Sequence, residues 1–550
     1  MKNKKESISR KEAIKRLGGL AMGLPFGASV ISKITSSENS GESIFSSEIL
    51  QPGEQRRIQA DLNNIKGKRS GAFNFCVGSG HARLGLRADW QEHLKIVKDA
   101  IDFKYIRFHG LLDDDMGVFR NRGKAKSIYN WQYIDKLYDF LLSIDVRPLV
   151  ELSFMPSALA SGNKTAFWYH GNSTQPKSFQ KWGDFITALI QHFENRYGRK
   201  EVEKWFFEVW NEPNLTFFFH GTQSDYYKLY TTTAKAIKKV SSTYQVGGPA
   251  TAGAAWIPDT IQYCKQHNVP LDFITTHQYG VHGVAIDAKG TKVLRMIKDV
   301  DVIANTVKKV RESIEHSAMP ELKLYMTEWS SSYSNVDPVH DTYQNAPYVL
   351  NTIKKSGDHA AALSYWTFTD VFEEGGPPVT PFEGGFGMLN MQGIKKPTFH
   401  AFKFLNELGK TEVKNTDQDS YVCMNENGEV QILFWNLNMP DETHTSDKKI
   451  FRKKLPSKSI GTVEIQVKNI QPGSYNRQIY QTGYKVNDPF TRYYEMGLPS
   501  QINPEQVKIL KEASSGSSVR SSEIHIKDGV YKESIQMREN DVFLIKLSKM

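Results

Sequence analysis

The chain has 550 residues, of which 12% are aromatic, and 70 basic against 60 acidic side chains give a formal net charge of +10. This length is too great for one compact core and suggests about two to four domains, one of them large enough for a full barrel. The charges are spread along the chain without long blocks of one sign, which indicates a solvated surface and disfavours a nucleic-acid partner. The cysteines, Cys76, Cys264 and Cys423, show neither paired metal-site spacing nor a disulfide framework.

The N-terminus has the order of regions found in export signals. Basic residues precede position 16, a weakly apolar run follows over 17–28, and a Ser-rich polar segment extends to about Ser47. The apolar run is shorter than the about 20 residues that a membrane-spanning helix needs. The pair Arg10-Lys11 resembles a twin-arginine signal in which lysine replaces the second arginine. We therefore expect residues 1–47 to be an export signal and polar linker of a periplasmic or extracellular protein; the alternative is a disordered N-terminus of a cytoplasmic one.

Between about residues 70 and 405, apolar runs of strand length alternate with amphipathic segments of helix length. The expected strands are 72–77, 105–109, 147–152, 205–210, 244–247, 273–277, 322–326 and 361–366, and the expected helices include 90–100, 130–143, 178–197, 224–240, 300–316 and 348–356. Eight strands alternating with helices over about 300 residues predict an α/β fold, a (β/α)8 TIM barrel over residues 48–405. An open doubly wound sheet is disfavoured, because Gly78-Ser79-Gly80 lacks the third glycine and the downstream acid of a dinucleotide site.

After about residue 410 the pattern changes to short alternating runs separated by turn residues. The clearest runs are 421–424, 430–435, 463–467 and 541–547, and one helix is expected at about 504–513. This pattern predicts an accessory β-sandwich domain over residues 406–550. Because no long linker precedes it, we expect the two domains to be in close contact.

The fourth apolar run ends abruptly in Asn211-Glu212-Pro213-Asn214. Pro213 has no backbone N–H, so the chain must leave the sheet there. In a barrel of parallel strands the carboxyl ends of the strands form the catalytic face, and Asn211 and Glu212 are therefore expected to face a ligand. A merely solvated strand end is the alternative.

A second carboxylate, Glu328, follows the seventh apolar run. Two carboxyl groups across one barrel mouth are the minimum apparatus for glycoside hydrolysis, since one protonates the leaving oxygen and the other meets the oxocarbenium-like carbon. We expect the carboxyl groups of Glu212 and Glu328 to lie about 5–5.5 Å apart, as a retaining mechanism requires, whereas about 9 Å would indicate inversion.

Together these motifs resemble glycoside hydrolase family 39, which contains β-xylosidases and α-L-iduronidases. The matching segments are 76–80, 105–110, 114–117, 207–214, 246–250, 327–329, 364–374, 384–387, 495–499 and 504–506, so the similarity covers nearly everything after about residue 65. The resemblance implies a retaining double displacement in which Glu212 is the general acid and base and Glu328 is the nucleophile. It implies no cofactor and no metal.

The resemblance also assigns roles in binding. Asn211 would hold the sugar 2-hydroxyl, and Tyr279 would donate a hydrogen bond to the nucleophile, with His277 beside it. The expected lining of the subsite for the terminal sugar consists of His109, Trp366, Glu373 and Glu374. Carboxylates at that place suit a neutral sugar and would repel a uronic acid.

The preferred hypothesis is thus an exported, exo-acting β-xylosidase that acts on plant or related oligosaccharides. Glu383 stands where the xylosidases of the family commonly have histidine, so arabinose, galactose or a uronic acid remains an alternative sugar. A non-catalytic carbohydrate-binding barrel is disfavoured because both carboxylates are present. A metal-dependent hydrolase is disfavoured because His109 and His277 are too sparse a ligand set. No nucleic acid and no membrane span are expected, and the sequence leaves the oligomeric state open.

Overall fold

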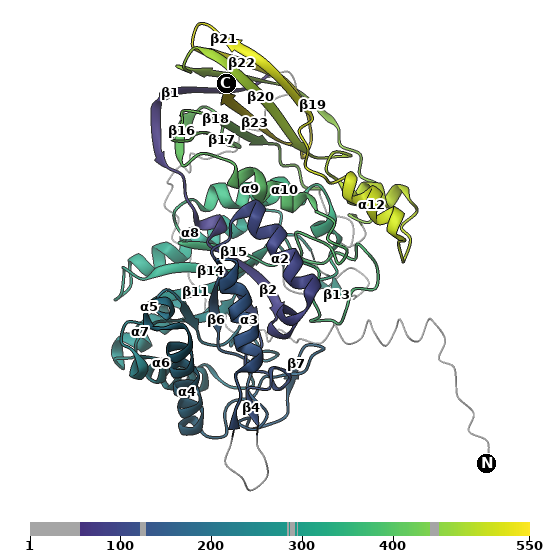
Figure 1. Ribbon diagram of the computed structural model, residues 1–550. Coiled ribbons are helices and arrows are strands. Elements are labelled where there is room, and N and C mark those ends of the chain that lie inside the picture. Colours follow the sequence, from purple (N-terminus) through teal and green to yellow (C-terminus); the bar gives the residue numbers. More distant parts are fainter. Residues whose placement is uncertain (1–54, 121–127, 283–284, 287–291, 294, 441–449) are drawn as a thin grey trace, which may run out of the picture. The chain divides into compact units, whose positions relative to one another are not determined.

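The computed structural model describes residues 55–120, 128–282, 285–286, 292–293, 295–440 and 450–550. The expected export signal and linker at 1–47 lie outside these residues. Within them the main structures are a closed barrel of eight strands and a separate sheet of nine strands (Figure 1). Among the helices of the described ranges, none has the length and apolar character needed to cross a membrane.

The barrel confirms the predicted (β/α)8 architecture. Its parallel strands are β2 (Cys76–His81), β3 (Tyr105–His109), β6 (Arg147–Glu151), β9 (Phe206–Glu208), β10 (Gln245–Ala252), β11 (Phe273–Tyr279), β14 (Lys323–Ser330) and β15 (Ala362–Tyr365). They neighbour one another in chain order, and β15 closes the barrel on β2. One prediction was wrong in detail, because Ala72–Asn74 forms a 3-10 helix rather than the start of the first strand. The side-chain amide of Asn74 donates to the carbonyl of Ile101, which ties this segment to the end of a helix.

Helices follow the strands as expected. They are α2 (Ala88–Ile101), α3 (Gln132–Ser143), α4 (Phe179–Tyr197), α5 (Arg199–Val202), α6 (Gln223–Val240), α7 (Ile257–Gln266), α8 (Val302–Glu315), α9 (Asn345–Ser356) and α10 (Pro397–Asn406). Ser178 caps α4 by accepting the backbone N–H of Lys181, which satisfies a donor that has no partner inside the helix. The same helix buries Trp182, Phe185 and Leu189 at the spacing of one apolar face, and each such side chain contributes about 1.5–3 kcal/mol on burial.

The amino-terminal end of the barrel is closed by an apolar layer. Six strands each contribute one buried side chain to it, namely Cys76, Leu149, Phe206, Phe273, Tyr325 and Ala362. The rings of Phe206 and Tyr325 meet edge to face at 5.3 Å, a favourable aromatic geometry. Since this end is filled, only the carboxyl ends of the strands are left to form a site.

The nine-stranded sheet forms the accessory domain. Its order is β21 (Arg520–Ile526), β20 (Gly473–Thr482), β23 (Val542–Lys549), β18 (Val430–Trp435), β17 (Ser420–Met424), β16 (Thr411–Asn415), β1 (Arg56–Lys68), β19 (Ser459–Lys468) and β22 (Val530–Arg538). β1 pairs antiparallel with β16 and parallel with β19, so these residues, which were expected in the barrel domain, belong to this sheet. The helix expected at 504–513 is α12 (Pro504–Glu512), and a shorter helix, α11 (Pro489–Glu495), precedes it.

Strand β18 is buried on both faces and separates two apolar cores. Val430, Ile432 and Phe434 point into the core enclosed by the nine-stranded sheet. Leu433 and Trp435 point to the other side and join the large core that contains the barrel and its helices. Alternate residues of a strand face opposite ways, which explains how one run serves both cores. The shared core accounts for the close contact expected between the two domains.

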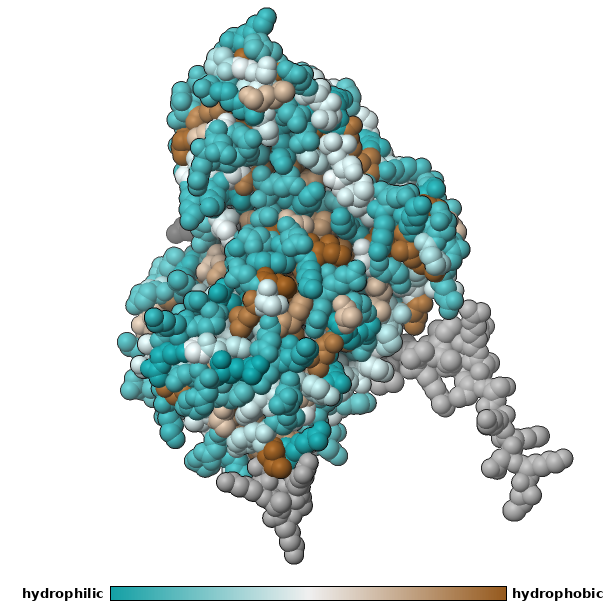
Figure 2. Space-filling view, in the orientation of Figure 1, coloured by the Kyte–Doolittle hydropathy of each residue, from teal (hydrophilic) through white to brown (hydrophobic). Residues whose placement is uncertain are grey.

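The face shown in Figure 2 is mainly hydrophilic, and its apolar areas are scattered among polar ones rather than gathered into one large patch. Scattered apolar residues of this kind are normal for a soluble domain surface.

Candidate active site

The two glutamates predicted to carry the chemistry lie together at the carboxyl ends of the barrel strands. Glu328 is on β14, and Glu212 follows β9 by four residues. One oxygen of each carboxyl group and a ring nitrogen of His277 lie within 4.8 Å of one another. Both glutamates are buried, with 7% of Glu212 and 4% of Glu328 exposed. The separation is the short one expected from the sequence rather than about 9 Å.

The backbone around Glu212 is held in an unusual conformation. Trp210 and Glu212 have φ values of 72° and 41°, in the left-handed region that residues with a side chain seldom adopt. The Glu212 N–H donates to the carbonyl of Ala250 on β10, and the Trp210 indole donates to the carbonyl of Phe218, each at 2.9 Å. Strained residues of this kind persist only where the surrounding structure fixes them, and they are frequent at active sites.

A bulge in β14 brings two consecutive side chains into the barrel. Thr276 of β11 pairs with Met326 and His277 pairs with Glu328, so Thr327 is an extra residue between them. In a regular strand Thr327 and Glu328 would point to opposite faces. With the bulge, Thr327 bonds to Glu208 while Glu328 bonds to Arg107, both inside the barrel.

Arg107, at the centre of β3, joins the polar groups of the site. It is fully buried and donates to Glu328 at 2.7 Å, to Glu208 at 2.5 Å and to Asn211 Oδ1 at 2.9 Å. It also lies 2.8 Å from Glu151. Burial opposes the guanidinium charge, but the three carboxylates raise the pKa of Arg107 well above its usual value. One permanent cation therefore compensates three buried acids and orients Asn211.

Both oxygens of Glu328 accept hydrogen bonds. Arg107 Nη1 donates to Oε1 at 2.7 Å and the Tyr279 hydroxyl donates to Oε2 at 2.6 Å. Burial and the neighbouring Glu328 raise the pKa of Tyr279 well above its usual value, so this phenol keeps its proton and remains a donor. Two short bonds to donors are typical of an ionised carboxylate.

The surroundings of Glu212 are different. Its Oε1 lies 2.9 Å from Nδ1 of His277. Burial, and then the negative charge of Glu328, raise the pKa of Glu212 well above its usual value. Burial, and then the positive charge of Arg107, lower the pKa of His277 well below its usual value. A carboxyl group that keeps its proton thus faces a carboxylate, which is the contrast that acid–base chemistry between two glutamates needs.

His109, Trp366 and Glu374, which the sequence places in the lining of the sugar subsite, gather beside this pair. His109 Nδ1 lies 2.8 Å from Glu151, its Nε2 lies 3.4 Å from Glu374, and its ring centre is 4.8 Å from that of Trp366. Burial disfavours charge on His109, but Glu151 and then Glu374 raise its pKa to about 10. At neutral pH His109 is therefore an imidazolium between two acids.

Glu373 is not brought into this group. Its Oε1 accepts from Nη1 of Arg87 at 2.7 Å, and Arg87 also binds Asp89. One oxygen of its carboxylate is thus bound to a guanidinium at the start of α2, and its expected place in the sugar-binding lining stays a prediction. Glu383 stands where the xylosidases of the family commonly have histidine. Its carboxylate accepts the backbone N–H of Val379 at 2.8 Å and so stabilises the turn over residues 379–383.

A hairpin made of β7 (Thr165–Ala166) and β8 (Gly171–Asn172) lies beside the site, because its Phe167 stacks on His109 with ring centres 5.7 Å apart. The N–H of Trp168, at its tip, donates to the carbonyl of Glu374 at 2.8 Å. Tyr169 stacks on His81 with ring centres 3.9 Å apart. The hairpin is thus attached to the loop after β15, the same loop that supplies Glu374.

Comparison with known proteins agrees with this geometry. The sequence matches the model of Glycosyl hydrolases family 39 over residues 56–526. The chain belongs to this family. It is 43% identical to a β-xylosidase of Caldicellulosiruptor saccharolyticus over 476 residues, which are 84% of this chain and 92% of that protein. It is 38% identical to a β-xylosidase of Geobacillus stearothermophilus over 493 residues, 87% of this chain and 93% of that protein.

A crystal structure of the family 39 enzyme from Xanthomonas axonopodis pv. citri has the same fold. It superimposes with a TM-score of 0.88 and 38% sequence identity, over 91% of this chain and 98% of the other. Family membership and fold together confirm the resemblance seen in the sequence. This family 39 member is therefore a glycosidase, and its substrate is a carbohydrate.

Several polar residues of the glycosidase site were missed by sequence reasoning, namely Arg107, Glu151, Glu208 and Thr327. Three of them had a visible signal, because a charged residue inside or at the end of an apolar strand run is buried and needs a partner. Arg107 alternates with His109 along one strand, and Glu208 precedes Glu212 by four positions, which is two strand repeats. Thr327 had no such signal, since its inward direction depends on the bulge.

Two groups of side chains in the described part of the glycosidase have the spacing of metal ligands. One is Glu212, His277 and Glu328, whose atoms are engaged in the hydrogen bonds given above. The other is His81, Asp113 and Asp115. Burial opposes charge on His81, but Asp113 and then Asp115 raise its pKa to about 9, so at neutral pH it pairs with Asp113 as a protonated imidazole, and a metal ion would have to displace that proton.

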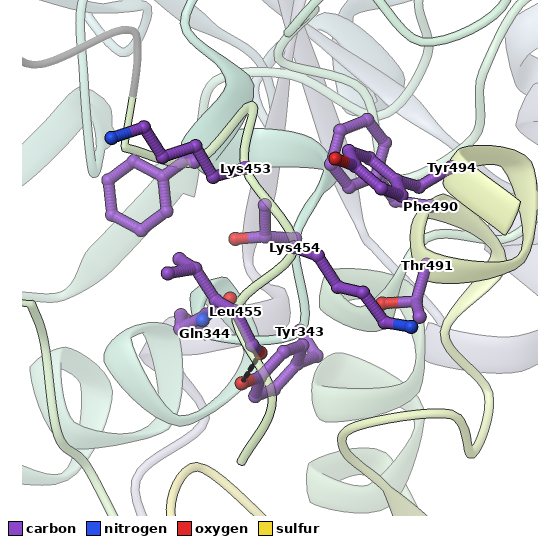
Figure 3. A pocket seen from close by; sticks show the side chains of 10 residues that line it. Tyr343, Gln344, Lys453, Lys454, Leu455, Phe490, Thr491 and Tyr494 are labelled. Atoms are coloured by element: carbon purple, nitrogen blue, oxygen red, sulfur yellow. Dashed lines mark hydrogen bonds between the residues drawn. The ribbon is translucent and has the colours of Figure 1, made fainter. Parts of the chain in front are cut away.

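A separate hollow of the glycosidase is lined by other residues (Figure 3). It is lined mainly by Tyr343, Gln344, Lys453, Lys454, Leu455, Phe490, Thr491 and Tyr494. The Tyr343 hydroxyl bonds across it to the carbonyl of Leu455 at 2.8 Å. Its volume of about 20 Å³ has room for about one water molecule, so it is not a sugar site.

Proposed function

We propose that this glycosidase is an exo-acting β-xylosidase that releases terminal xylose from oligosaccharides with retention of configuration. The observation that carries the proposal is the pair of buried carboxyl groups, Glu212 and Glu328, with oxygens within 4.8 Å of each other and with contrasting partners. This separation leaves no room for a water between the sugar and the second carboxylate, which favours a double displacement.

In the first step Glu328 attacks the anomeric carbon while Glu212 gives its proton to the glycosidic oxygen. The bond to the leaving group breaks, and an ester to Glu328 forms. In the second step Glu212 takes a proton from water, the water oxygen bonds to the anomeric carbon, and the ester bond to Glu328 breaks. The proton kept on Glu212 and the two donors on Glu328 support these roles.

Asn211 is arranged to donate to the sugar. Its Oδ1 accepts from Arg107 at 2.9 Å, which leaves the amide N–H groups to face the ligand. A donor beside the nucleophile suits the 2-hydroxyl, whose hydrogen bonds strengthen in the transition state. The Trp366 ring beside His109 offers an apolar face to the pentose.

The charges favour a neutral sugar. Glu374 stands beside His109, and a uronate carboxylate there would meet a second acid. Arg87, the cation near the adjacent Glu373, is already shared by Glu373 and Asp89. The names of the two β-xylosidase relatives point the same way.

The hairpin at 165–172 supports exo action. It is attached to Glu374 through Trp168, so it adds a wall where a long polysaccharide would otherwise continue. We further propose that the protein is exported, on the basis of the basic, apolar and polar regions of residues 1–47. Fractionation of cells that produce the full chain tests this second proposal, and enzyme that stays in the cytosol would contradict it.

The experiment is hydrolysis of a panel of aryl glycosides by the wild type and by Glu212→Gln. The panel contains the β-D-xyloside, α-L-arabinoside, β-D-galactoside and α-L-iduronide. We expect the β-D-xyloside to be cleaved fastest, and its cleavage to be nearly lost in Glu212→Gln when the leaving phenol is a poor one. A faster reaction with another sugar would refute the specificity, and unchanged activity of Glu212→Gln would refute the mechanism.

A further inference from the structure

A chain of buried side chains runs from Glu212 into the barrel. His277 lies between Glu212 and Thr327, with Nδ1 2.9 Å from Glu212 Oε1 and Nε2 3.1 Å from Thr327 Oγ1. Thr327 Oγ1 lies 2.8 Å from Glu208 Oε1, and Glu208 Oε2 lies 2.5 Å from Nε of Arg107. All five side chains are buried, so water does not replace these partners.

The direction of each hydrogen bond follows from the arginine end of this chain. Arg107 has only donors, so Glu208 accepts from it. Burial raises the pKa of Glu208 above its usual value, and Arg107 opposes this rise. The 2.5 Å hydrogen bond from this permanent cation favours the carboxylate form of Glu208, which has no proton to give. The single hydroxyl proton of Thr327 must then point to Glu208. Thr327 Oγ1 can therefore only accept from His277, which places the ring proton on Nε2.

We propose that Thr327 and Glu208 are positioning residues that hold His277 as its Nε2–H tautomer, so that its Nδ1 accepts the proton of Glu212. Since burial and the nearby Arg107 lower the pKa of His277 well below its usual value, the ring is neutral and Nδ1 carries a lone pair. A protonated Glu212 donates to that lone pair, whereas an ionised Glu212 would be repelled by it. The inference rests on the proposed role of Glu212 as general acid.

The opposite tautomer would have the opposite effect on catalysis. An N–H on Nδ1 would donate to Glu212 and would favour its carboxylate, which cannot protonate a leaving group. The hydroxyl of Thr327, two hydrogen bonds away, thus controls how firmly Glu212 holds its proton. The other charged or titratable groups that face Glu212 or His277 are Glu328, Tyr279, His109, Arg107 and Glu374. The Thr327 hydroxyl bonds to His277 and Glu208 and not to any of these five.

The variant Thr327→Val tests whether the Thr327 hydroxyl holds the His277 tautomer, and Thr327→Ser is its matched control. Valine keeps the shape but removes the acceptor for His277 Nε2, whereas serine keeps the hydroxyl. The pH profile of kcat/KM falls on its alkaline side as Glu212 loses its proton. In Thr327→Val we expect this alkaline limb to move to lower pH by about one unit, so that at pH values above the limb kcat/KM is about tenfold lower than in the wild type. Thr327→Ser should keep the limb of the wild type.

The leaving group provides a second readout. Xylosides with poor leaving groups need the proton of Glu212, but dinitrophenyl xylosides do not, so Thr327→Val should slow the former about tenfold more than the latter. A side chain that only fills space would change stability without changing this ratio. The proposal would be overturned if Thr327→Val and Thr327→Ser had the same alkaline limb of kcat/KM and the same ratio of rates on xylosides with poor and good leaving groups.

Neutron crystallography of the wild type gives a test that does not depend on folding of a variant. A deuteron on Nε2 of His277 and one on the Glu212 carboxyl group support the proposal, and a deuteron on Nδ1 overturns it. The proposed function fails separately, if Glu212→Gln retains wild-type cleavage of a poor leaving group. That outcome would remove the acid itself, whatever the state of His277.

Discussion

Replacement of Arg107 by methionine should be among the most damaging single changes in the barrel. Arg107 is fully buried and is the cation shared by Glu151, Glu208 and Glu328. Removal of one partner of a buried ion pair typically costs 3–5 kcal/mol, because the remaining charge is left without compensation. With three acids left behind, we expect the free energy of unfolding of Arg107→Met to fall by at least about 4 kcal/mol at pH 7.

The pH dependence of this loss identifies its cause. Without Arg107 the buried carboxylates bind protons more tightly in the folded than in the unfolded state. Groups whose folded pKa is raised contribute stability below their unfolded pKa of about 4.3 and lose it as pH rises. The difference between wild type and Arg107→Met should therefore be larger at pH 8 than at pH 5.

The assay is urea unfolding at several pH values, with two variants for comparison. Arg107→Lys keeps the positive charge but loses the several N–H donors of the guanidinium. Its free energy of unfolding should therefore lie between those of the wild type and Arg107→Met. Arg147→Met removes a partly exposed partner of Glu201 and should cost about 1 kcal/mol or less. A loss below about 1 kcal/mol for Arg107→Met, or a loss that does not change with pH, would refute the account of a shared buried cation.

Three further predictions concern single side chains. Glu328→Ala should be nearly inactive, and azide should restore turnover with the anomer opposite to that of the wild type as product; a restored wild-type anomer would remove Glu328 from the role of nucleophile. Glu374→Gln should lower kcat/KM on the β-xyloside about 10- to 100-fold, as expected for loss of a hydrogen bond to a charged group, whereas Glu373→Gln should change it less than about threefold; the reverse order would contradict the assignment of these two acids. Because the pKa of His81 is raised to about 9 by its pair with Asp113, this pair stabilises the fold fully below about pH 6.5 and loses its effect as pH rises through 9. Unfolding curves should therefore show the greatest difference between wild type and His81→Gln below pH 6.5, and a difference that is constant to pH 9.5 would count against the charged pair.

Much of the fold was predictable from sequence, because strand and helix periodicities are local. The eight barrel strands were all predicted, and the helix expected at 178–197 is α4, which begins directly after its cap Ser178. The pairing of β1 with β16 and β19 was not, since it joins segments about 350 to 400 positions apart and no local pattern encodes it. The local sequence of a strand such as β1 does not determine which sheet the strand joins.

The candidate site divides in the same way. Glu212 and Glu328 were predictable because a carboxylate at the end of a strand in a parallel barrel has only one face to occupy. The partners that set their protonation were not, because they depend on tertiary contacts. Glu373 was predicted in the sugar-binding lining from its position in the chain. Its ion pair with Arg87 was not predictable, because it depends on how the loop after β15 meets the start of α2.

The roles of Glu212 and Glu328 are tested most directly by trapping the glycosyl-enzyme with a 2-deoxy-2-fluoro-β-D-xylosyl donor and mapping the modified peptide by mass spectrometry. We expect one added fluorosugar, on Glu328, and faster accumulation in Glu212→Gln when the donor carries a good leaving group. Label on another side chain, or wild-type turnover of a β-xyloside without any trapped ester, would contradict the assignment of Glu328 as nucleophile and Glu212 as acid and base.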